Sequence, residues 1–245
     1  MHRSRIPEAV PRAEAARQRR SPGRQRFTIT VADERHARHA ETICAEMEQS
    51  AHVRGTGIAK RSPEYLRAKM RDGKAVIALT PDGEWAGFCY IETWDHGRFV
   101  ANSGLIVAPA FRHAGLARSI KRRIFALSRE RHPDAKIFGL TTGLAVMKIN
   151  SELGYKPVTY SELTSDDEFW AGCASCVNVS ILAAKERKNC LCTAMLYDPE
   201  TAAKRGNDAT RSFWDFTLES PLYARYQRLK QAAFQALLPG RTQEK

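Results

Sequence analysis

The stretch from Val107 to Ser119, VAPAFRHAGLARS, combines residue types and a spacing that can bind an anion. Residues 101–107 are typical of a strand, and a helix is expected from Ala114 to Arg131. A loop of small residues between a strand and a helix N-terminus directs several backbone N–H groups at one point, where they can bind phosphate. The alternative is an ordinary strand-to-helix turn. The expected phosphate cradle consists of Arg112, His113, Ala114, Gly115, Leu116, Ala117 and Arg118. Leu105, Ile106 and Val107 form the strand end before it, whose backbone N–H groups are expected to polarise a carbonyl oxygen of the ligand.

Four cysteines form a second group, with the spacing C-x2-C-x13-C-x-C: Cys173, Cys176, Cys190 and Cys192. Two close pairs of thiolates suit a tetrahedral zinc ion, and four protein ligands would make the site structural. Cys190 and Cys192 are two residues apart, so on a strand they would face the same side. The alternatives are a cluster of inert thiols and an iron–sulfur or disulfide role. Because the N-terminus lacks an apolar signal region, we expect a reducing, cytoplasmic location.

The elements that would position these residues alternate between strands and helices. Strands are expected at residues 27–31, 75–80, 85–93, 98–107, 136–141 and 156–160. Helices are expected at residues 33–49, 64–71, 114–131 and 144–153, with Gly154 ending the last of them. Pro81 to Glu84 is a strong turn between two strands. The order is therefore that of a mixed α/β domain.

The motif R-x-x-G-x-A at Arg112 to Ala117, together with this order of elements, resembles the GCN5-related N-acetyltransferase (GNAT) superfamily. The resemblance covers about residues 27–160. It implies a mixed central sheet that is splayed at an acyl-CoA site and flanked by helices, with the cradle holding the pyrophosphate of coenzyme A. The implied organisation is a basic extension (1–26), the GNAT domain (27–160), a Cys-rich segment that completes it (161–199) and a C-terminal helical extension (200–245).

A finer resemblance lies at residues 139–142, 153–158 and 192–196, GLTT, LGYKPV and CTAML. These segments are similar to the short amino-acid acetyltransferases of the N-acetylglutamate synthase type. That resemblance implies an N-acyltransferase of arginine biosynthesis that acylates the α-amine of glutamate or a close relative. It leaves open whether the donor is acetyl-CoA or succinyl-CoA. The alternatives are a GNAT enzyme acting on another amine or a protein, and a non-catalytic acyl-CoA-binding module.

Three positions depart from the superfamily pattern, and the first is Gly143, where many members have an Asn early in the helix. Where many members have a proton-donating Tyr this chain has Asn150, which can only donate from its amide. Where many have a Glu on the strand before the cradle it has Ala101. Glu92 on the preceding strand is the nearest candidate base, with Asp95, His96 or a water chain as alternatives. Glu92 could instead be a solvent-facing strand residue.

The resemblance implies that the segment between the first two helices covers the amine-binding end of the cleft. Its cations Arg54, Lys60 and Arg61 could hold an acidic acceptor, because a guanidinium can bind a carboxylate through two hydrogen bonds. The alternative is a mobile basic loop.

Charge and hydropathy narrow the range of partners. The net charge is +12, but residues 1–26 carry eight Arg against two Glu, which accounts for +6 of it. That tail has no aromatic residue before Phe27, so a solvated extension is favoured over a nucleic-acid arm. No apolar run approaches membrane-spanning length. An apolar stripe on the helix expected after Ser220 could pack on the domain or pair with a second subunit, which leaves a homodimer open.

Overall fold

The computed structural model describes residues 26–54, 59–205 and 228. The predicted basic extension and the predicted helix after Ser220 therefore lie almost wholly outside the described residues. None of the helices that the described part of the chain forms is long and apolar enough to cross a bilayer.

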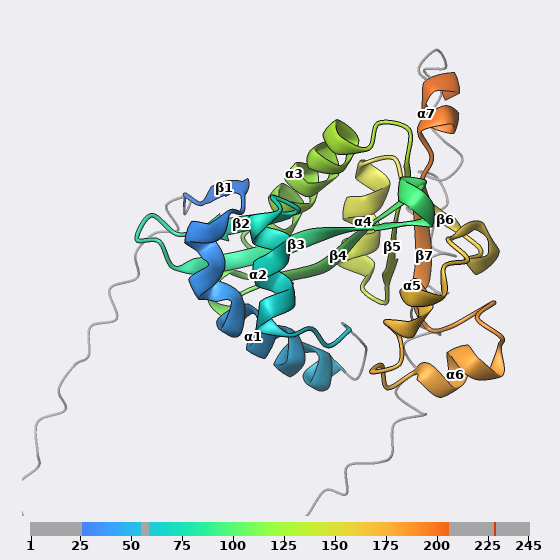
Figure 1. Cartoon of the computed structure of the whole chain (residues 1–245), viewed down its shortest axis with the longest axis horizontal. Coiled ribbons are helices and arrows are strands. Elements are labelled where there is room, and N and C mark those ends of the chain that lie inside the picture. Colours follow the sequence, from blue (N-terminus) through green and yellow to red (C-terminus); the bar gives the residue numbers. More distant parts are fainter. Residues whose placement is uncertain (1–25, 55–58, 206–227, 229–245) are drawn as a thin grey trace, which may run out of the picture.

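A seven-stranded mixed sheet forms the centre of the molecule, in the order β1-β2-β3-β4-β5-β7-β6 (Figure 1). Neighbouring strands are antiparallel except β4 and β5, which are parallel. The strands are β1 Thr28–Val31, β2 Ala75–Leu79, β3 Trp85–Trp94, β4 Phe99–Val107, β5 Lys136–Thr141, β6 Lys156–Val158 and β7 Thr193–Tyr197. The predicted mixed sheet is confirmed.

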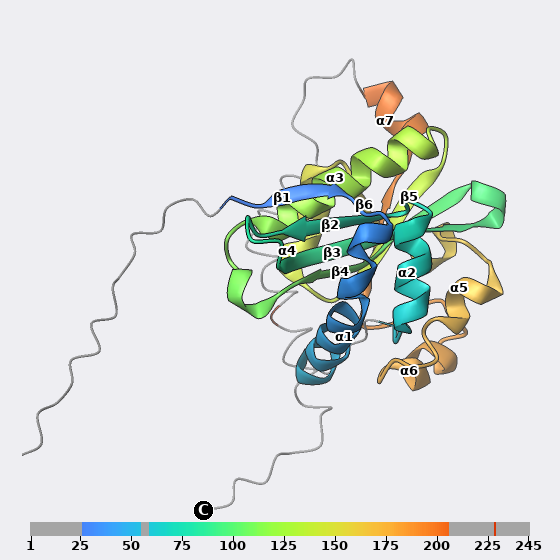
Figure 2. The ribbon, with the colours of Figure 1, turned by 60° about the vertical axis from the view of Figure 1, so that its left-hand side comes forward.

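Helices cover both faces of the sheet, with α1 and α2 on one face and α3 and α4 on the other (Figures 1 and 2). The short helices α5 and α6 lie on the α2 side, beyond the end of that helix. The helices are α1 Ala40–Arg54, α2 Pro63–Arg71, α3 Leu116–Arg131, α4 Leu144–Glu152, α5 Asp167–Ala171, α6 Val179–Ala184 and α7 Pro199–Arg205.

Alternation along the strands explains why both faces are covered. In β2, Ala75 and Ile77 pack with α1 and α2, whereas the intervening Val76 and Ala78 pack with α3. Since successive strand side chains point to opposite faces, an apolar residue at every position requires a cover on each side. Fully burying one such aliphatic side chain contributes about 1.5–3 kcal/mol.

The parallel strands β4 and β5 separate soon after they begin. Their pairing runs only from Phe99–Lys136 to Ala101–Phe138, so residues 102–107 do not pair with β5. Next to this gap the register of β3 against β4 shifts, and Gly104 has φ of +63°. A Cβ at Gly104 would lie 2.4 Å from the Tyr90 ring, so only glycine fits this bulge.

Several sequence predictions need correction. No strand was expected at Thr193–Tyr197, which pairs between β5 and β6. Cys190 and Cys192 precede that strand and do not share one of its faces. The first helix begins as a 3₁₀ turn, Glu34–His39, because Asp33 and His36 form a capping box there. Helix α3 begins at Leu116, two residues later than expected, because Gly115 is left-handed.

Candidate active site at the gap in the sheet

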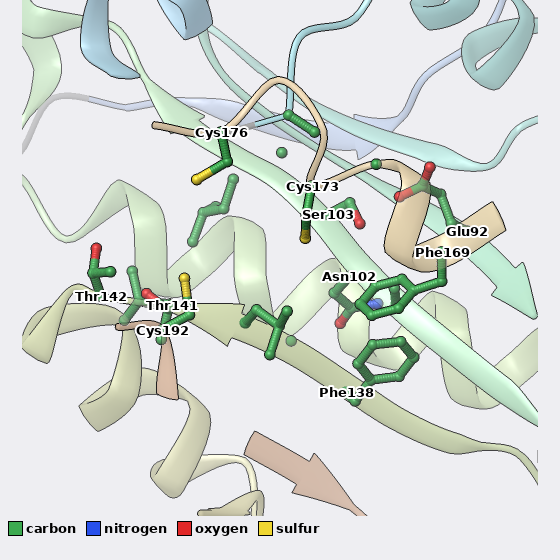
Figure 3. A pocket seen from close by; sticks show the side chains of 18 of the residues that line it. Glu92, Asn102, Ser103, Phe138, Thr141, Thr142, Phe169, Cys173, Cys176 and Cys192 are labelled. Carbon is green, nitrogen blue, oxygen red and sulfur yellow. The ribbon is translucent and has the colours of Figure 1, made fainter. Parts of the chain in front are cut away.

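A cavity of about 260 Å³ opens where β4 and β5 separate. Its walls come from both strands, from α3 and α4 on one face of the sheet, and from the Cys-rich segment on the other. Figure 3 shows Asn102 and Ser103 of β4 on one side of the cavity and Thr141, Thr142 and Cys192 on another. The rings of Phe138 and Phe169 meet edge to face, with centroids 5.0 Å apart. The cavity therefore passes through the sheet.

The predicted cradle lies at the end of β4, where the chain turns into α3. Gly115 has φ of +76°, and a Cβ built there meets nothing within 4 Å, so the loop leaves open space above the helix N-terminus. The first turn of α3 has N–H groups without intrahelical acceptors, as at any helix start. Among the residues that the structure describes, no side chain caps this end of α3. The backbone of the loop can therefore receive a phosphate.

The arginines of the cradle have structural partners. Arg112 donates to the Val107 carbonyl at 3.2 Å and to Glu46 Oε1 at 2.7 Å, which ties the loop to α1. Arg118 donates twice to Glu152 of α4, each time at 2.8 Å. Of the predicted strand residues, Leu105 lines the cavity and Ile106 is buried among α1 and α2 residues.

Glu92 lines the cavity and is buried, with 5% of its surface exposed. Its Oε1 accepts hydrogen bonds from Arg61 Nη2 at 3.2 Å and from the Tyr65 hydroxyl. Arg61 also donates to the Tyr90 hydroxyl at 3.1 Å. Burial and the bond to Glu92 raise the pKa of Tyr65, and burial raises the pKa of Tyr90, so both remain protonated donors at neutral pH. Glu92 is therefore not a solvent-facing strand residue.

The three predicted acceptor cations have different positions. Arg61 lines the cavity and pairs with Glu92, so the structure brings together two residues that the sequence assigned separate roles. Lys60 is exposed and pairs with Glu48 at 3.0 Å, outside the cavity lining. The side chain of Arg54 lies outside the described residues.

Asn150 lies on α4 and lines the cavity from the face opposite Glu92. It is 1% exposed, and its Nδ2 lies 3.7 Å from the Met195 sulfur. Its Oδ1 has no hydrogen-bond partner among the described residues. A buried amide oxygen without a partner is costly, and this one is located in the cavity wall.

Sequence reasoning missed Lys121 of α3, which also lines the cavity and is 2% exposed. Its Nζ donates to Asn102 Oδ1 at 3.3 Å and lies 5.1 Å from the Tyr155 ring centroid. Asn102 is held in place because its Nδ2 donates to Ser128 at 2.8 Å while its Oδ1 also accepts from the Tyr155 hydroxyl at 3.0 Å. Burial lowers the pKa of Lys121 to about 8. The signal in the sequence is its place one turn from Ala117 and from Ile124, beside the apolar stripe.

The four cysteines all line the cavity, on the side of Arg61 and Glu92. Figure 3 shows Cys173 and Cys176 on the segment that crosses the cavity opposite Cys192. Burial raises the pKa of Cys173 to about 11, and a hydrogen bond to Cys190 together with burial raises that of Cys192. In the described part of the chain no three Cys, His, Asp or Glu side chains are grouped closely enough to hold a metal. The described structure therefore does not support the predicted zinc site.

Comparisons with known proteins identify the fold of this chain. No protein-family model matches the chain, and no curated protein matches it. Among solved structures, N-acetylglutamate synthase from Neisseria gonorrhoeae, complexed with coenzyme A and N-acetyl-glutamate, is 17% identical with a TM-score of 0.51. The match covers 71% of this chain and 35% of that one, so this chain spans about a third of its length.

A Mycobacterium tuberculosis protein solved in complex with CoA is 16% identical, with a TM-score of 0.50. That match covers 70% of this chain and 98% of the other. Together with the sheet order and the gap between β4 and β5, these similarities show that the chain has the GNAT fold. The superfamily resemblance seen in the sequence is confirmed at the level of the fold.

Proposed function

We propose that this protein is an acyl-CoA-dependent N-acyltransferase that modifies the α-amine of a small amino acid, with glutamate or a close relative as acceptor. The observation that carries the proposal is the cavity through the sheet. It is lined by the buried carboxylate of Glu92, which can receive a proton, and by the part of β4 that does not pair with β5. The same strand leads to the open N-terminus of α3, which can receive phosphates.

The donor end supports acyl-CoA. The cradle from His113 to Ala117 would hold the pyrophosphate through backbone N–H groups and the N-terminus of α3. The edge of β4 beyond Ala101 does not pair with β5, so its amides can bond to the pantetheine arm and to the thioester oxygen. Both structural neighbours named above were solved with coenzyme A.

The acceptor end supports a small polar amine. Trp94, Phe138 and Phe169 line the cavity there, beside Arg61 and Glu92. The printed ligand of the Neisseria enzyme is N-acetyl-glutamate, which is consistent with a dicarboxylate acceptor. The cationic residue for an acceptor carboxylate is Arg61, which would then be shared between that carboxylate and Glu92.

Direct transfer is the reaction that these residues favour. The acceptor's neutral amine attacks the thioester carbonyl, and Glu92 receives the proton that the nitrogen releases, directly or through water. An acyl intermediate on Cys173 is disfavoured because burial raises the pKa of that thiol, and the thiolate is the nucleophilic form. The cavity would act mainly by holding the amine and thioester within reach of each other.

The test is release of free CoA from acetyl-CoA and from succinyl-CoA across a panel of amino acids. We expect turnover with glutamate or a related acidic amino acid, and product that carries the acyl group on its α-amine by mass spectrometry. Turnover only with a protein or a polyamine would show that the acceptor is not an amino acid. Binding of acetyl-CoA without turnover for any acceptor would point to a binding module.

A further inference from the structure

We infer that Lys121 donates the proton to the thiolate of coenzyme A as it leaves, supplying from α3 the acid that the Asn150 position on α4 lacks. The inference rests on the proposed function. It concerns a residue that the superfamily pattern in the sequence does not mark.

Lys121 lies on the face of the gap opposite Glu92. It lines the same cavity as Asn102 and Asn150, and all three come from the α3 and α4 face of the gap. Glu92 and Arg61 lie on the other face. With the amine on the Glu92 side, the sulfur of a bound thioester can lie on the side of Lys121 and Asn150.

The ammonium group of Lys121 has more hydrogen-bond donors than it uses within the described part of the protein. An ammonium has three N–H donors, and Asn102 Oδ1 is its one hydrogen-bond acceptor that the described residues provide. Asn102 cannot rotate away, because Ser128 and Tyr155 hold its two ends. Lys121 is thus aimed by its neighbours and retains donors for a group inside the cavity.

The groups around Lys121 are uncharged near neutral pH. The titratable groups that face Lys121 are Cys89 of β3 and Tyr155 after α4. Burial raises the pKa of Cys89 to about 11 and also raises that of Tyr155, so both are neutral near pH 8. Burial lowers the pKa of Lys121 to about 8, which is close to the value of an ordinary thiol. Proton transfer between this ammonium and a thiolate is therefore nearly balanced.

The proposed step conserves atoms and charge. The C–S bond of the tetrahedral intermediate breaks, and its electron pair goes to sulfur. Lys121 Nζ transfers one proton to that sulfur, giving CoA as a thiol and leaving a neutral amine. The proton that the acceptor nitrogen releases goes to Glu92 and then to solvent, from which Lys121 is protonated again.

The experiment measures the pKa of the CoA thiol in its complex with the protein, from thiolate ultraviolet absorbance. The complex with desulfo-CoA is subtracted to remove the protein's own cysteines. We expect the bound thiol of the wild-type complex to titrate at least about one pH unit below free CoA, because a nearby ammonium stabilises the thiolate. Lys121→Met should remove that shift while binding CoA about as tightly, and Arg122→Met, the exposed neighbour, should keep it.

Turnover gives a second readout. Lys121→Met should lower kcat about 100-fold or more with acetyl-CoA, and should lose far less with an aryl thioester, whose thiolate leaves without protonation. A wild-type complex whose CoA thiol titrates as in free solution overturns the inference, and this result needs no variant to fold. An equal loss with both donors also overturns it. Failure of the wild type to bind CoA would instead overturn the proposed function.

Discussion

At the scale of single residues, Glu92 is the group on which proton removal depends in the proposed reaction. Glu92→Gln keeps the shape of the side chain but cannot accept a proton. We expect kcat to fall about 100-fold or more, with a smaller change in the acceptor KM. Steady-state kinetics at several pH values measure this. Tyr65→Phe is the matched control, since it removes one hydrogen bond to Glu92 and leaves the carboxylate. A Gln variant with wild-type kcat would contradict the assignment.

The pair of Arg61 with Glu92 has a consequence for stability. Removing one partner of a buried ion pair leaves the other charge unpaired, at a cost of about 3–5 kcal/mol. We therefore expect Arg61→Ala to lower the free energy of unfolding by an amount of that order in denaturant titrations. Adding Glu92→Gln should recover part of the loss. Lys60→Ala breaks an exposed pair and should change stability by less than about 1 kcal/mol. Additive effects of the two changes would mean that the pair is not formed.

Lys121 links stability to pH. Its pKa in the folded protein is about 8, against about 10.4 in an unfolded chain. Between these values the unfolded chain binds more protons, so this residue's contribution to the free energy of unfolding rises with pH. We expect wild type to gain about 3 kcal/mol relative to Lys121→Met between about pH 7.5 and 10.5. Parallel pH dependences of the two proteins would show that the buried ammonium is not perturbed.

The sequence predicts which residues are chemically suited to the site better than it predicts which of them contact each other. The sequence identifies Glu92 and Arg61 as chemically competent, but the two are 31 positions apart, and only the fold brings the segment before α2 against β3. Lys121 was missed because five arginines surround it in α3, so one more cation there looks like part of a solvated face. Its burial depends on the packing of α3 against β3 and β4.

At the scale of elements, the turn from β4 into α3 is the part of the site most directly readable from sequence. Gly115→Glu places a carboxylate over the helix N-terminus, where it would repel phosphate. It also forces an L-residue to adopt φ of +76°, which destabilises the folded state by about 1–2 kcal/mol. We expect the variant to fold and to bind CoA at least tenfold more weakly by calorimetry, in line with a charge-assisted contact of about 1.5–3 kcal/mol. Gly115→Ala carries the same strain without the charge, so equal losses in both variants would assign the effect to strain.

The order of elements up to β6 followed from local signals such as the 81–84 turn and the Gly154 cap. The insertion of β7 between β5 and β6 did not, because Thr193–Tyr197 is short and its place depends on pairing with Gly139 and Pro157, far away in sequence. The positions of the cysteines also depend on contacts that are far apart in the sequence. Their spacing allows a metal, whereas the loops that carry them follow the cavity wall.

At the scale of the whole molecule, the Cys-rich segment is part of the enclosure of the cavity and is held by packing. Trp170, Leu182 and Leu196 are buried together there. We therefore expect a strong chelator to leave the melting temperature unchanged, and metal analysis to find no stoichiometric zinc. Iodoacetamide should modify Cys173 slowly at neutral pH, since the pKa of about 11 leaves little thiolate. One tightly held zinc per chain would contradict this description.

The short pairing of β4 with β5 divides the sheet into two blocks, β1 to β4 and β5 to β7, joined along that seam by three residue pairs. Elsewhere along the seam each strand has backbone groups but no neighbour across the gap. A donor whose arm carries its own amides would complete the ladder between the blocks as an inserted strand does. The molecule would then become a continuous sheet when the donor is bound, so the substrate would act for that period as a structural member of the fold.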